Sequence, residues 1–154
     1  MTTALSSTPT PPPELPGARR LDPDTDRPAV ARLFLAAYRG TVDDEGETED
    51  DALAAVDALL AGEFGAFDGE ASEVVERDGV LAAATLLTDF DGGPFVAFSM
   101  TDPAFQRQGL ARAGLQRAMA VLAARGETSL DLVVTAANDR AVALYERLGF
   151  ADRA

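Results

Sequence analysis

The pattern of apolar residues is most regular in the second half of the chain, where short apolar runs precede segments of helical period. Residues 96–101 (VAFSMT) are mostly apolar and lie between two turn sequences, as is typical of a buried strand. Apolar residues then recur at helical spacing from Leu110 to Leu122, and Gly126 stands where a left-handed C-terminal cap is expected. This pattern predicts a strand that leads through a short loop into a helix.

The same order of elements is repeated further along the chain. In residues 130–135 (LDLVVT) the two leucines and Val134 occupy every second position, as in a strand. Asn138 is a suitable helix N-cap, and an apolar stripe over residues 141–148 ends at Gly149. The second half of the chain is therefore predicted to contain, in order, a strand, a turn, a helix, a strand and a helix.

The first half of the chain contains two helical patterns and several strand patterns. An apolar stripe over residues 30–38 follows potential N-caps at residues 24–26, and a second stripe over residues 53–60 ends at Gly62. Short apolar runs bounded by turn residues predict further strands. The strand patterns cover residues 73–77, 80–88 and 95–101, with room for a short first strand at residues 18–21.

The turns between these strands decide how the strands pair. Asp78-Gly79 has the residues of a two-residue hairpin turn, and residues 91–94 (DGGP) form a second turn. Three hairpin-linked strands make an antiparallel meander, whereas the later strand-helix-strand unit places its strands in parallel. We therefore predict an α/β fold with a mixed, mostly antiparallel sheet flanked by helices.

The composition indicates one domain preceded by a tail. With 154 residues and 47% hydrophobic content, the chain can bury a sizeable core. Residues 1–17 (MTTALSSTPTPPPELPG) are rich in Ser, Thr and Pro and predict a disordered or polyproline-like tail. The single domain is then expected over residues 18–154.

Residues 106–111 (QRQGLA) connect a predicted strand to a predicted helix and carry the first candidate chemistry. The first amides of a helix have no intrahelical partner and lie at the positive end of its dipole, so this turn suits a phosphate or pyrophosphate. Gly109 and Ala111 allow an anion to approach the backbone closely, and Arg107 and Arg112 add positive charge. The alternative is an ordinary strand-to-helix turn with solvated arginines.

Two spaced motifs carry a resemblance to a known family. The first is Pro103-x-x-Gln106-x-x-Gly109-x-Ala111, and the second is Asn138-x-x-Ala141-x-x-x-Tyr145-x-x-Leu148-Gly149-Phe150. Together, and in this order, they resemble the GNAT superfamily of acetyl-CoA-dependent N-acetyltransferases. The resemblance implies a GNAT-like fold, acetyl-CoA as co-substrate, and direct attack on its thioester by a primary amine of a small molecule or a peptide.

The resemblance also implies roles for individual residues. Backbone groups of Ser99, Met100 and Thr101 hold the pantetheine arm and polarise the thioester carbonyl. Asn138 bonds the coenzyme, and Tyr145 protonates the departing thiolate as general acid, unless it is a core or rim tyrosine of its helix. The pyrophosphate is held by amides from Arg107, Gln108, Gly109, Leu110, Ala111 and Arg112.

Residues 41–51 (TVDDEGETEDD) form the most acidic run of the chain. Thr48 and Asp51 resemble a helix capping pair, and carboxylates near a helix N-terminus are stabilising, so capping and solvation explain much of this acidity. In the fold that the resemblance implies, this connection borders the acceptor groove. The candidates to bind a positively charged amine are then Asp43, Asp44, Glu45 and Glu47.

Charge and missing residue types narrow the chemistry further. The formal net charge of −13 disfavours nucleic acid and favours a cationic acceptor, although it also serves solubility. The absence of cysteine and histidine removes thiolate nucleophiles, disulfides and imidazole bases, and we expect no metal. No segment is apolar enough to cross a bilayer or resembles a secretory signal, so we expect a cytoplasmic protein with no membrane partner.

The sequence departs from the resemblance at two points. In ribosomal-protein N-terminal acetyltransferases of the superfamily, a glutamate five residues before the asparagine acts as base, and Val133 stands there. Asp131, a loop carboxylate acting through water, or an amine that arrives deprotonated could replace it. The C-terminal strand pair of the family is also shortened, because the chain reaches Ala154 soon after Phe150. A partner chain could supply it, and the open edge at residues 130–135 predicts a homodimer.

Two functions therefore remain compatible with the sequence. N-acetyl transfer to a primary amine is favoured, and a non-catalytic acyl-CoA-binding or sensing module is the alternative because the base is missing. A phosphate-loop nucleotidase is disfavoured, since no Gly-Lys-Ser/Thr sequence is present.

Overall fold

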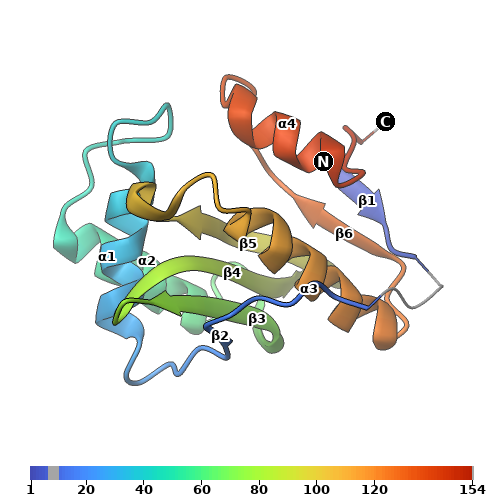
Figure 1. Ribbon diagram of the computed structural model, residues 1–154, viewed down its shortest axis with the longest axis horizontal. Helices are drawn as coiled ribbons and strands as arrows, with labels where there is room; N and C mark the ends of the chain where they lie inside the picture. The colour runs from blue at the N-terminus through green and yellow to red at the C-terminus, as the bar shows by residue number, and fades with distance from the viewer. Residues whose placement is uncertain (7–10, 154) are drawn as a thin grey trace.

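A six-stranded sheet, in the order β1-β6-β5-β4-β3-β2, organises the protein (Figure 1). The structure is a computed structural model that describes residues 1–6 and 11–153. All neighbouring strands are antiparallel except β5 and β6, which confirms the predicted mixed, mostly antiparallel sheet. The strands are β1 (Thr2–Ala4), β2 (Ala18–Arg19), β3 (Ala66–Arg77), β4 (Val80–Phe90), β5 (Gly93–Thr101) and β6 (Ser129–Leu132).

Helices cover both faces of this sheet. The helices α1 (Arg27–Tyr38) and α2 (Glu49–Leu60) pack on one face, and α3 (Leu110–Ala124) packs on the other. A 3-10 turn, η1 (Pro103–Phe105), precedes α3, and α4 (Asp139–Arg147) follows β6. This order agrees with the helical stripes of the sequence, because α1, α2 and α3 bury their apolar sides against the sheet. The stripe of α4 is only partly buried.

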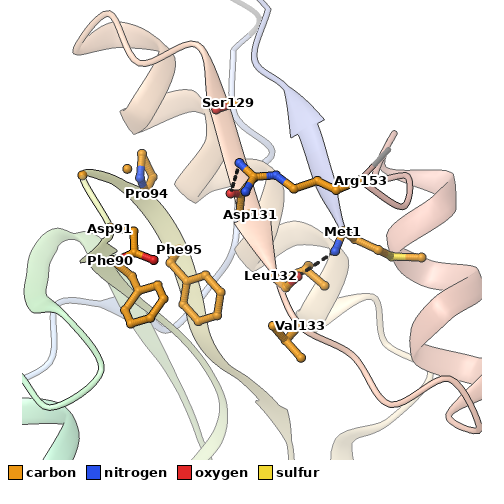
Figure 2. Close-up of a pocket in the computed structure, with 12 residues that line it drawn as sticks. Met1, Phe90, Asp91, Pro94, Phe95, Ser129, Asp131, Leu132, Val133 and Arg153 are labelled. Atoms are coloured by element: carbon orange, nitrogen blue, oxygen red, sulfur yellow. Dashed lines mark hydrogen bonds and ion pairs between the residues drawn. The ribbon is translucent and has the colours of Figure 1, made fainter.

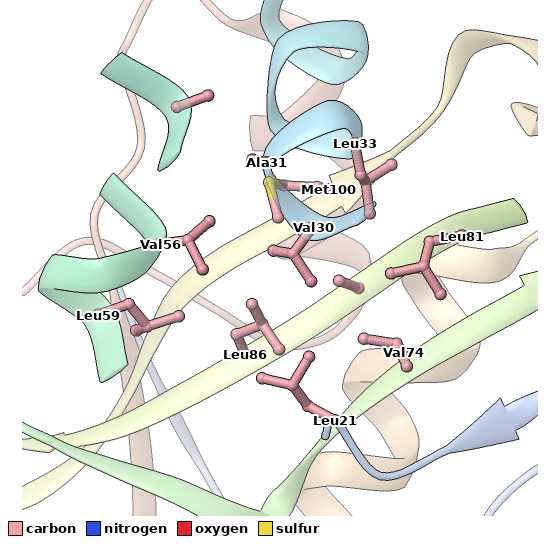
Figure 3. Close-up of a cluster of buried hydrophobic side chains, with 12 residues drawn as sticks. Leu21, Val30, Ala31, Leu33, Val56, Leu59, Val74, Leu81, Leu86 and Met100 are labelled. Atoms are coloured by element: carbon pink, nitrogen blue, oxygen red, sulfur yellow. The ribbon is translucent and has the colours of Figure 1, made fainter. Parts of the chain in front are cut away.

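The central strand β4 separates two hydrophobic clusters. Its residues Leu86 and Leu87 are fully buried but point to opposite faces, since side chains alternate along a strand. Leu86 belongs to the cluster under α1 and α2, where Val30 and Leu59 also lie (Figure 3). Leu87 belongs to the cluster under α3, with Leu115. The two clusters hold β4 in the middle layer and fix the position of β5 beside it.

The two predicted hairpin turns are present. Asp78 and Gly79 have φ values of 52° and 79°, and Asp91 and Gly92 have values of 53° and 79°. Positive φ at both central positions is the type I′ geometry that matches the twist of paired strands. The meander β3-β4-β5 is therefore set by local turn chemistry.

The strands β5 and β6 pair over two positions and then separate. Phe95 pairs with Asp131 and Val96 pairs with Leu132, but residues 97–101 have no partner in β6. Ala97 also has no partner in β4, so β5 carries a bulge where the two strands begin to diverge. The edge of β5 that faces β6 is consequently free of sheet hydrogen bonds over its last residues.

The N-terminal residues differ from the tail predicted for residues 1–17. Residues 2–4 form β1, which is antiparallel to β6, and the amino group of Met1 donates to the Leu132 carbonyl at 2.8 Å. Unpaired strand edges carry free N–H and C=O groups, and these residues satisfy them. The predicted disorder is therefore wrong for residues 2–4, and residues 7–10 of that prediction lie outside the described residues.

The same pairing changes the expectation for the C-terminal edge. The edge of β6 that is predicted to be open to a second copy is occupied by β1 of the same chain. Thr2 also bridges to Ala151, the residue after Phe150. The place beside β6 is thus filled within the chain, and the original reason for expecting a homodimer is lost.

Candidate active site

A cavity of about 420 Å³ lies where β5 and β6 separate, and we call it the interstrand cavity. Its walls come from the end of α1, the connection between α1 and α2, the end of β5, the start of α3, and α4. The lining residues are Ala37, Tyr38, Thr41, Asp43, Ser99, Met100, Thr101, Phe105, Gln106, Arg107, Gly109, Leu110, Ala111, Arg112, Asn138, Arg140, Ala141, Leu144, Tyr145 and Arg147.

The start of α3 presents free amides to this cavity. Gly109 is the N-cap and has a φ of 74°, a left-handed conformation that glycine adopts without strain. The first bond of the helix runs from the Ala113 amide to the Gly109 carbonyl at 2.9 Å, so residues 110–112 have no intrahelical partner for their amides. A Cβ added at Gly109 would meet nothing within 4 Å, which leaves the approach to these amides open. The turn can therefore receive an anion.

Positive charge gathers around the same amides. Although the protein has a net charge of −13, four arginines line the cavity: Arg107, Arg112, Arg140 and Arg147. Arg140, in the first turn of α4, donates a hydrogen bond to the Gln106 side-chain oxygen at 2.8 Å and so links α4 to the loop before α3. This end of the cavity is suited to a phosphorylated ligand.

Tyr145 reaches the cavity from α4 beside the end of β5. Burial raises the pKa of its phenol and the nearby charge of Asp43 raises it further, whereas a hydrogen bond with the Ser99 side chain acts in the opposite direction. The net shift is upward, so the phenol stays protonated at neutral pH. A protonated phenol at this position can donate a proton to a leaving group.

Asn138 is the N-cap of α4, as the sequence predicts. Its side-chain oxygen accepts a hydrogen bond from the Ala141 amide at 3.2 Å. Its side-chain nitrogen donates to a carboxylate oxygen of Asp43 at 3.3 Å. The side chain thus joins α4 to the connection between α1 and α2, a link that the motif alone did not suggest.

The four predicted acceptor-binding carboxylates are not equivalent. Asp43 lines the interstrand cavity, whereas Asp44, Glu45 and Glu47 are not among its lining residues. Asp44 accepts hydrogen bonds from the amides of Gly40 and Gly46, and these bonds lower its pKa and shape the loop. The Glu47 side chain accepts from the Glu45 amide. Most of the acidic run therefore orders its own backbone.

The predicted coenzyme residues are brought together with one exception. Ser99, Met100, Thr101 and Asn138 line the cavity, as do five of the six loop and helix residues, but Gln108 is exposed and does not. The cavity also contains residues that the sequence did not single out for a site, among them Tyr38, Thr41, Arg140 and Arg147. Arg140 could have been noticed two positions after the N-cap, whereas Tyr38 was hidden in the apolar stripe of its helix.

A second cavity, of about 440 Å³, opens beside the start of β5 and β6 (Figure 2). Asp131 and Val133 line this second cavity and do not line the interstrand cavity. Asp131 forms an ion pair with Arg153 at 2.7 Å, and Val133 is 83% exposed. Neither residue faces Tyr145, so the structure separates both from the candidate acid.

Comparison with known proteins identifies the family. Residues 27–150 match the model of the Acetyltransferase (GNAT) family. The chain belongs to this family. Its resemblance to the superfamily, stated above from two motifs, is thereby confirmed.

Two members of the family are similar in sequence to parts of this chain. Ribosomal protein bS18-alanine N-acetyltransferase of Escherichia coli strain K12 is 53% identical over 49 residues, which cover 32% of this chain and 33% of that protein. Mycothiol acetyltransferase of Beutenbergia cavernae is 42% identical over 76 residues, covering 49% and 26% of the two proteins. These alignments span about a third or less of the relatives.

Solved structures agree over most of the chain. The crystal structure of the ribosomal-protein-S18-alanine N-acetyltransferase from Escherichia coli has a TM-score of 0.66 and 27% identity, and the match covers 89% of this chain and 78% of that one. A GNAT family acetyltransferase from Brucella melitensis, solved with acetyl-CoA, has a TM-score of 0.65 and 20% identity, covering 88% and 82%. The fold is shared with GNAT proteins.

None of the helices formed by residues 1–6 and 11–153 is long and apolar enough to cross a membrane. Within the same residues, no group of three or more Asp, Glu, His or Cys side chains could hold a metal ion.

Proposed function

We propose that this GNAT chain transfers the acetyl group of acetyl-CoA to a primary amine by direct attack. The observation that carries the proposal is the combination, in one cavity, of free helix amides at residues 110–112 with a protonated phenol at Tyr145. The amides would hold the pyrophosphate of the coenzyme, and the phenol would serve its thioester end. Family membership supports the same activity, and the relatives named above are acetyltransferases, the Escherichia coli protein among them an N-acetyltransferase.

The fit of the coenzyme to these residues supports the proposal. The amides around Gly109 and the flanking arginines would take the pyrophosphate, and the unpaired edge of Ser99 to Thr101 would hold the pantetheine arm. When bound, acetyl-CoA supplies the activated acetyl group. Tyr145 would give its proton to the departing sulfur, because its raised pKa keeps that proton in place until a basic thiolate forms.

We propose that the acceptor is a cationic amine, of a small molecule or of a peptide. Asp43 in the cavity and the net charge of −13 both favour a positively charged acceptor, which the negative field would attract. The Escherichia coli relative is named for an alanine of ribosomal protein bS18. Peptides that begin with alanine therefore belong in the acceptor panel.

The experiment is an acetylation assay with the purified chain. Acetyl-CoA is incubated with a panel of small amines and alanine-initiated peptides while free thiol is followed, and mass spectrometry identifies the acetylated product. We expect thiol release that depends on an amine. Thermal stabilisation by acetyl-CoA without turnover on any amine would instead favour the acyl-CoA-binding or sensing module.

Cellular location and assembly are separate proposals. A cytoplasmic location is tested by fractionation of cells that express the chain. The prediction of a homodimer rested on an open edge of β6, and β1 occupies that edge. Sedimentation that shows only monomer at high micromolar concentration would exclude it.

A further inference from the structure

We propose that Asp43 receives the proton that the attacking amine must lose. This inference rests on the proposed acetyl transfer and names its base. Among the described residues, Asp43 is the only carboxylate that lines the interstrand cavity. The cavity otherwise offers phenols, arginines, hydroxyls, the side-chain amides of Gln106 and Asn138, and apolar side chains, none of which is a base at neutral pH.

The other candidates are excluded by their positions. Val133, at the place where the resemblance implies a glutamate, has no titratable group, is 83% exposed and does not line the interstrand cavity. Asp131 is paired with Arg153 in the second cavity (Figure 2). The loop carboxylate of Asp44 is engaged with two backbone amides outside the interstrand cavity.

The carboxylate of Asp43 is held in a defined orientation by two hydrogen-bond donors from a distant part of the chain. The Thr135 hydroxyl donates to one carboxylate oxygen at 2.5 Å, and the Asn138 side-chain nitrogen donates to the other at 3.3 Å. Each oxygen therefore receives one donor and keeps acceptor capacity for a further proton. Both donors lie in the segment between β6 and α4, and Tyr145 lies on α4 directly after that segment, so neighbouring parts of the chain position the base and the acid.

The charged and titratable groups around Asp43 favour this role. Tyr38 of α1 and Tyr145 of α4 both sense its negative charge, which contributes to raising the pKa of each phenol, after the larger effect of burial. Glu47 of the same loop acts on Tyr38 in the same direction. The positive groups that share the cavity are Arg107, Arg112, Arg140 and Arg147. Asp43 thus supplies the local negative charge that an ammonium group needs.

The step balances in atoms and charge. A bound ammonium gives one proton to the Asp43 carboxylate, and its nitrogen lone pair then forms the C–N bond to the acetyl carbon as the C–S bond breaks. Tyr145 gives its proton to the sulfur, and the nitrogen loses its second proton to water. Tyr145 is reprotonated from solvent and Asp43 releases its proton there, so one turnover on an ammonium releases one proton overall.

The test compares Asp43→Asn with wild type across a range of pH, using an alanine-initiated peptide as acceptor. We expect kcat/KM to fall by about 100-fold at neutral pH, within the range for general base catalysis. The deficit should shrink as the pH rises above the pKa of the peptide amino group, about 8, since the acceptor then arrives unprotonated. Acetyl-CoA affinity, measured by calorimetry, should change little.

The matched control is Asp78→Asn, which removes one negative charge in an exposed type I′ turn where Asn-Gly is equally suitable. It should behave as wild type, and Asp43→Glu should recover part of the lost rate. An Asp43→Asn rate equal to wild type, or a deficit that is constant with pH, would overturn the inference while acetyl transfer by the wild type still supported the proposed function. No turnover by the wild type on any amine would overturn both.

Discussion

At the scale of single residues, the behaviour of the interstrand cavity depends on what surrounds each polar group. Tyr145 is an ordinary phenol whose pKa rises because it is largely removed from water and lies near Asp43. Gly109 is an ordinary glycine whose φ of 74° permits the sharp entry into α3. Both residues could be named from the sequence, because each stands in a motif with a local mechanism. The partner that modifies Tyr145 could not, since Asp43 is about a hundred residues earlier in the chain.

Replacing Tyr145 by Phe removes the hydroxyl but keeps the ring and its contact with Phe150, whose centroid is 5.8 Å away. We expect turnover to fall by about 100-fold because the sulfur then leaves without a proton donor. Acetyl-CoA affinity should change little, as judged by calorimetry. A rate equal to wild type would show that Tyr145 is not the acid.

Replacing Gly109 by Glu places a carboxylate where the pyrophosphate is proposed to bind. The left-handed backbone should cost about 1–2 kcal/mol with any non-glycine residue, and the negative charge should weaken coenzyme binding further. Gly109→Ala carries the backbone strain without the charge. We expect calorimetry to give at least a tenfold weaker affinity for Glu than for Ala, and equal affinities would argue against an anion at this turn.

At the scale of elements, caps and turns explain why helices and hairpins begin and end where they do. The predicted pair at the start of α2 is a complete capping box: the Thr48 hydroxyl accepts from the Asp51 amide at 3.2 Å, and Asp51 accepts from the Thr48 amide at 2.9 Å. The lengths of the strands follow less directly from the sequence than the caps and turns do. β3 begins at Ala66 and not at residue 73, because its first part is held by pairing with the end of β4 across a bulge.

Thr48→Ala should lower the free energy of unfolding by about 1 kcal/mol through loss of this cap. The measurement is urea denaturation followed by circular dichroism. Thr128→Ala is the control, since Thr128 is exposed in the connection between α3 and β6. Equal midpoints for the two variants would contradict the cap's contribution.

At the scale of the whole molecule, the ion pair between β2 and the start of α1 makes the free energy of unfolding depend on pH. Asp26, at the start of α1, is 6% exposed and accepts hydrogen bonds from the Arg19 guanidinium of β2 at 2.7 and 2.9 Å. This contact is the main cause of its lowered pKa. In the unfolded chain the pKa of Asp26 is about 3.9, above its value in the folded protein. As the pH falls through about 3.9, the unfolded chain therefore takes up this proton before the folded protein does. The pair therefore stabilises the protein above that pH and less as the pH falls.

We expect the free energy of unfolding to decline as the pH is lowered from about 5 toward 3, because the Asp26 pair is progressively lost. Asp26→Asn should cost about 2 kcal/mol at pH 7, the value of hydrogen bonds to a charged group. It should also flatten the decline at low pH. Denaturation curves at several pH values test this, and identical pH slopes for wild type and variant would refute the assignment.

The sequence by itself determined those features that depend on residues a few positions apart. The two type I′ turns, the caps at Thr48 and Asn138, and the glycine entry into α3 follow from local backbone and hydrogen-bonding preferences. Because these signals mark successive elements, they predict the order of the elements from residue 18 onward and the position of the coenzyme motifs, but not β1.

Only the tertiary structure decided which distant segments meet. The pairing of β1 with β6 joins residues more than 120 positions apart, and the contact of Asp43 with Asn138 spans 95 positions. The same packing turns Asp131 and Val133 toward a different cavity from Tyr145. Such contacts depend on the paths of whole elements and on which strand edges remain to be paired, and no local pattern encodes them.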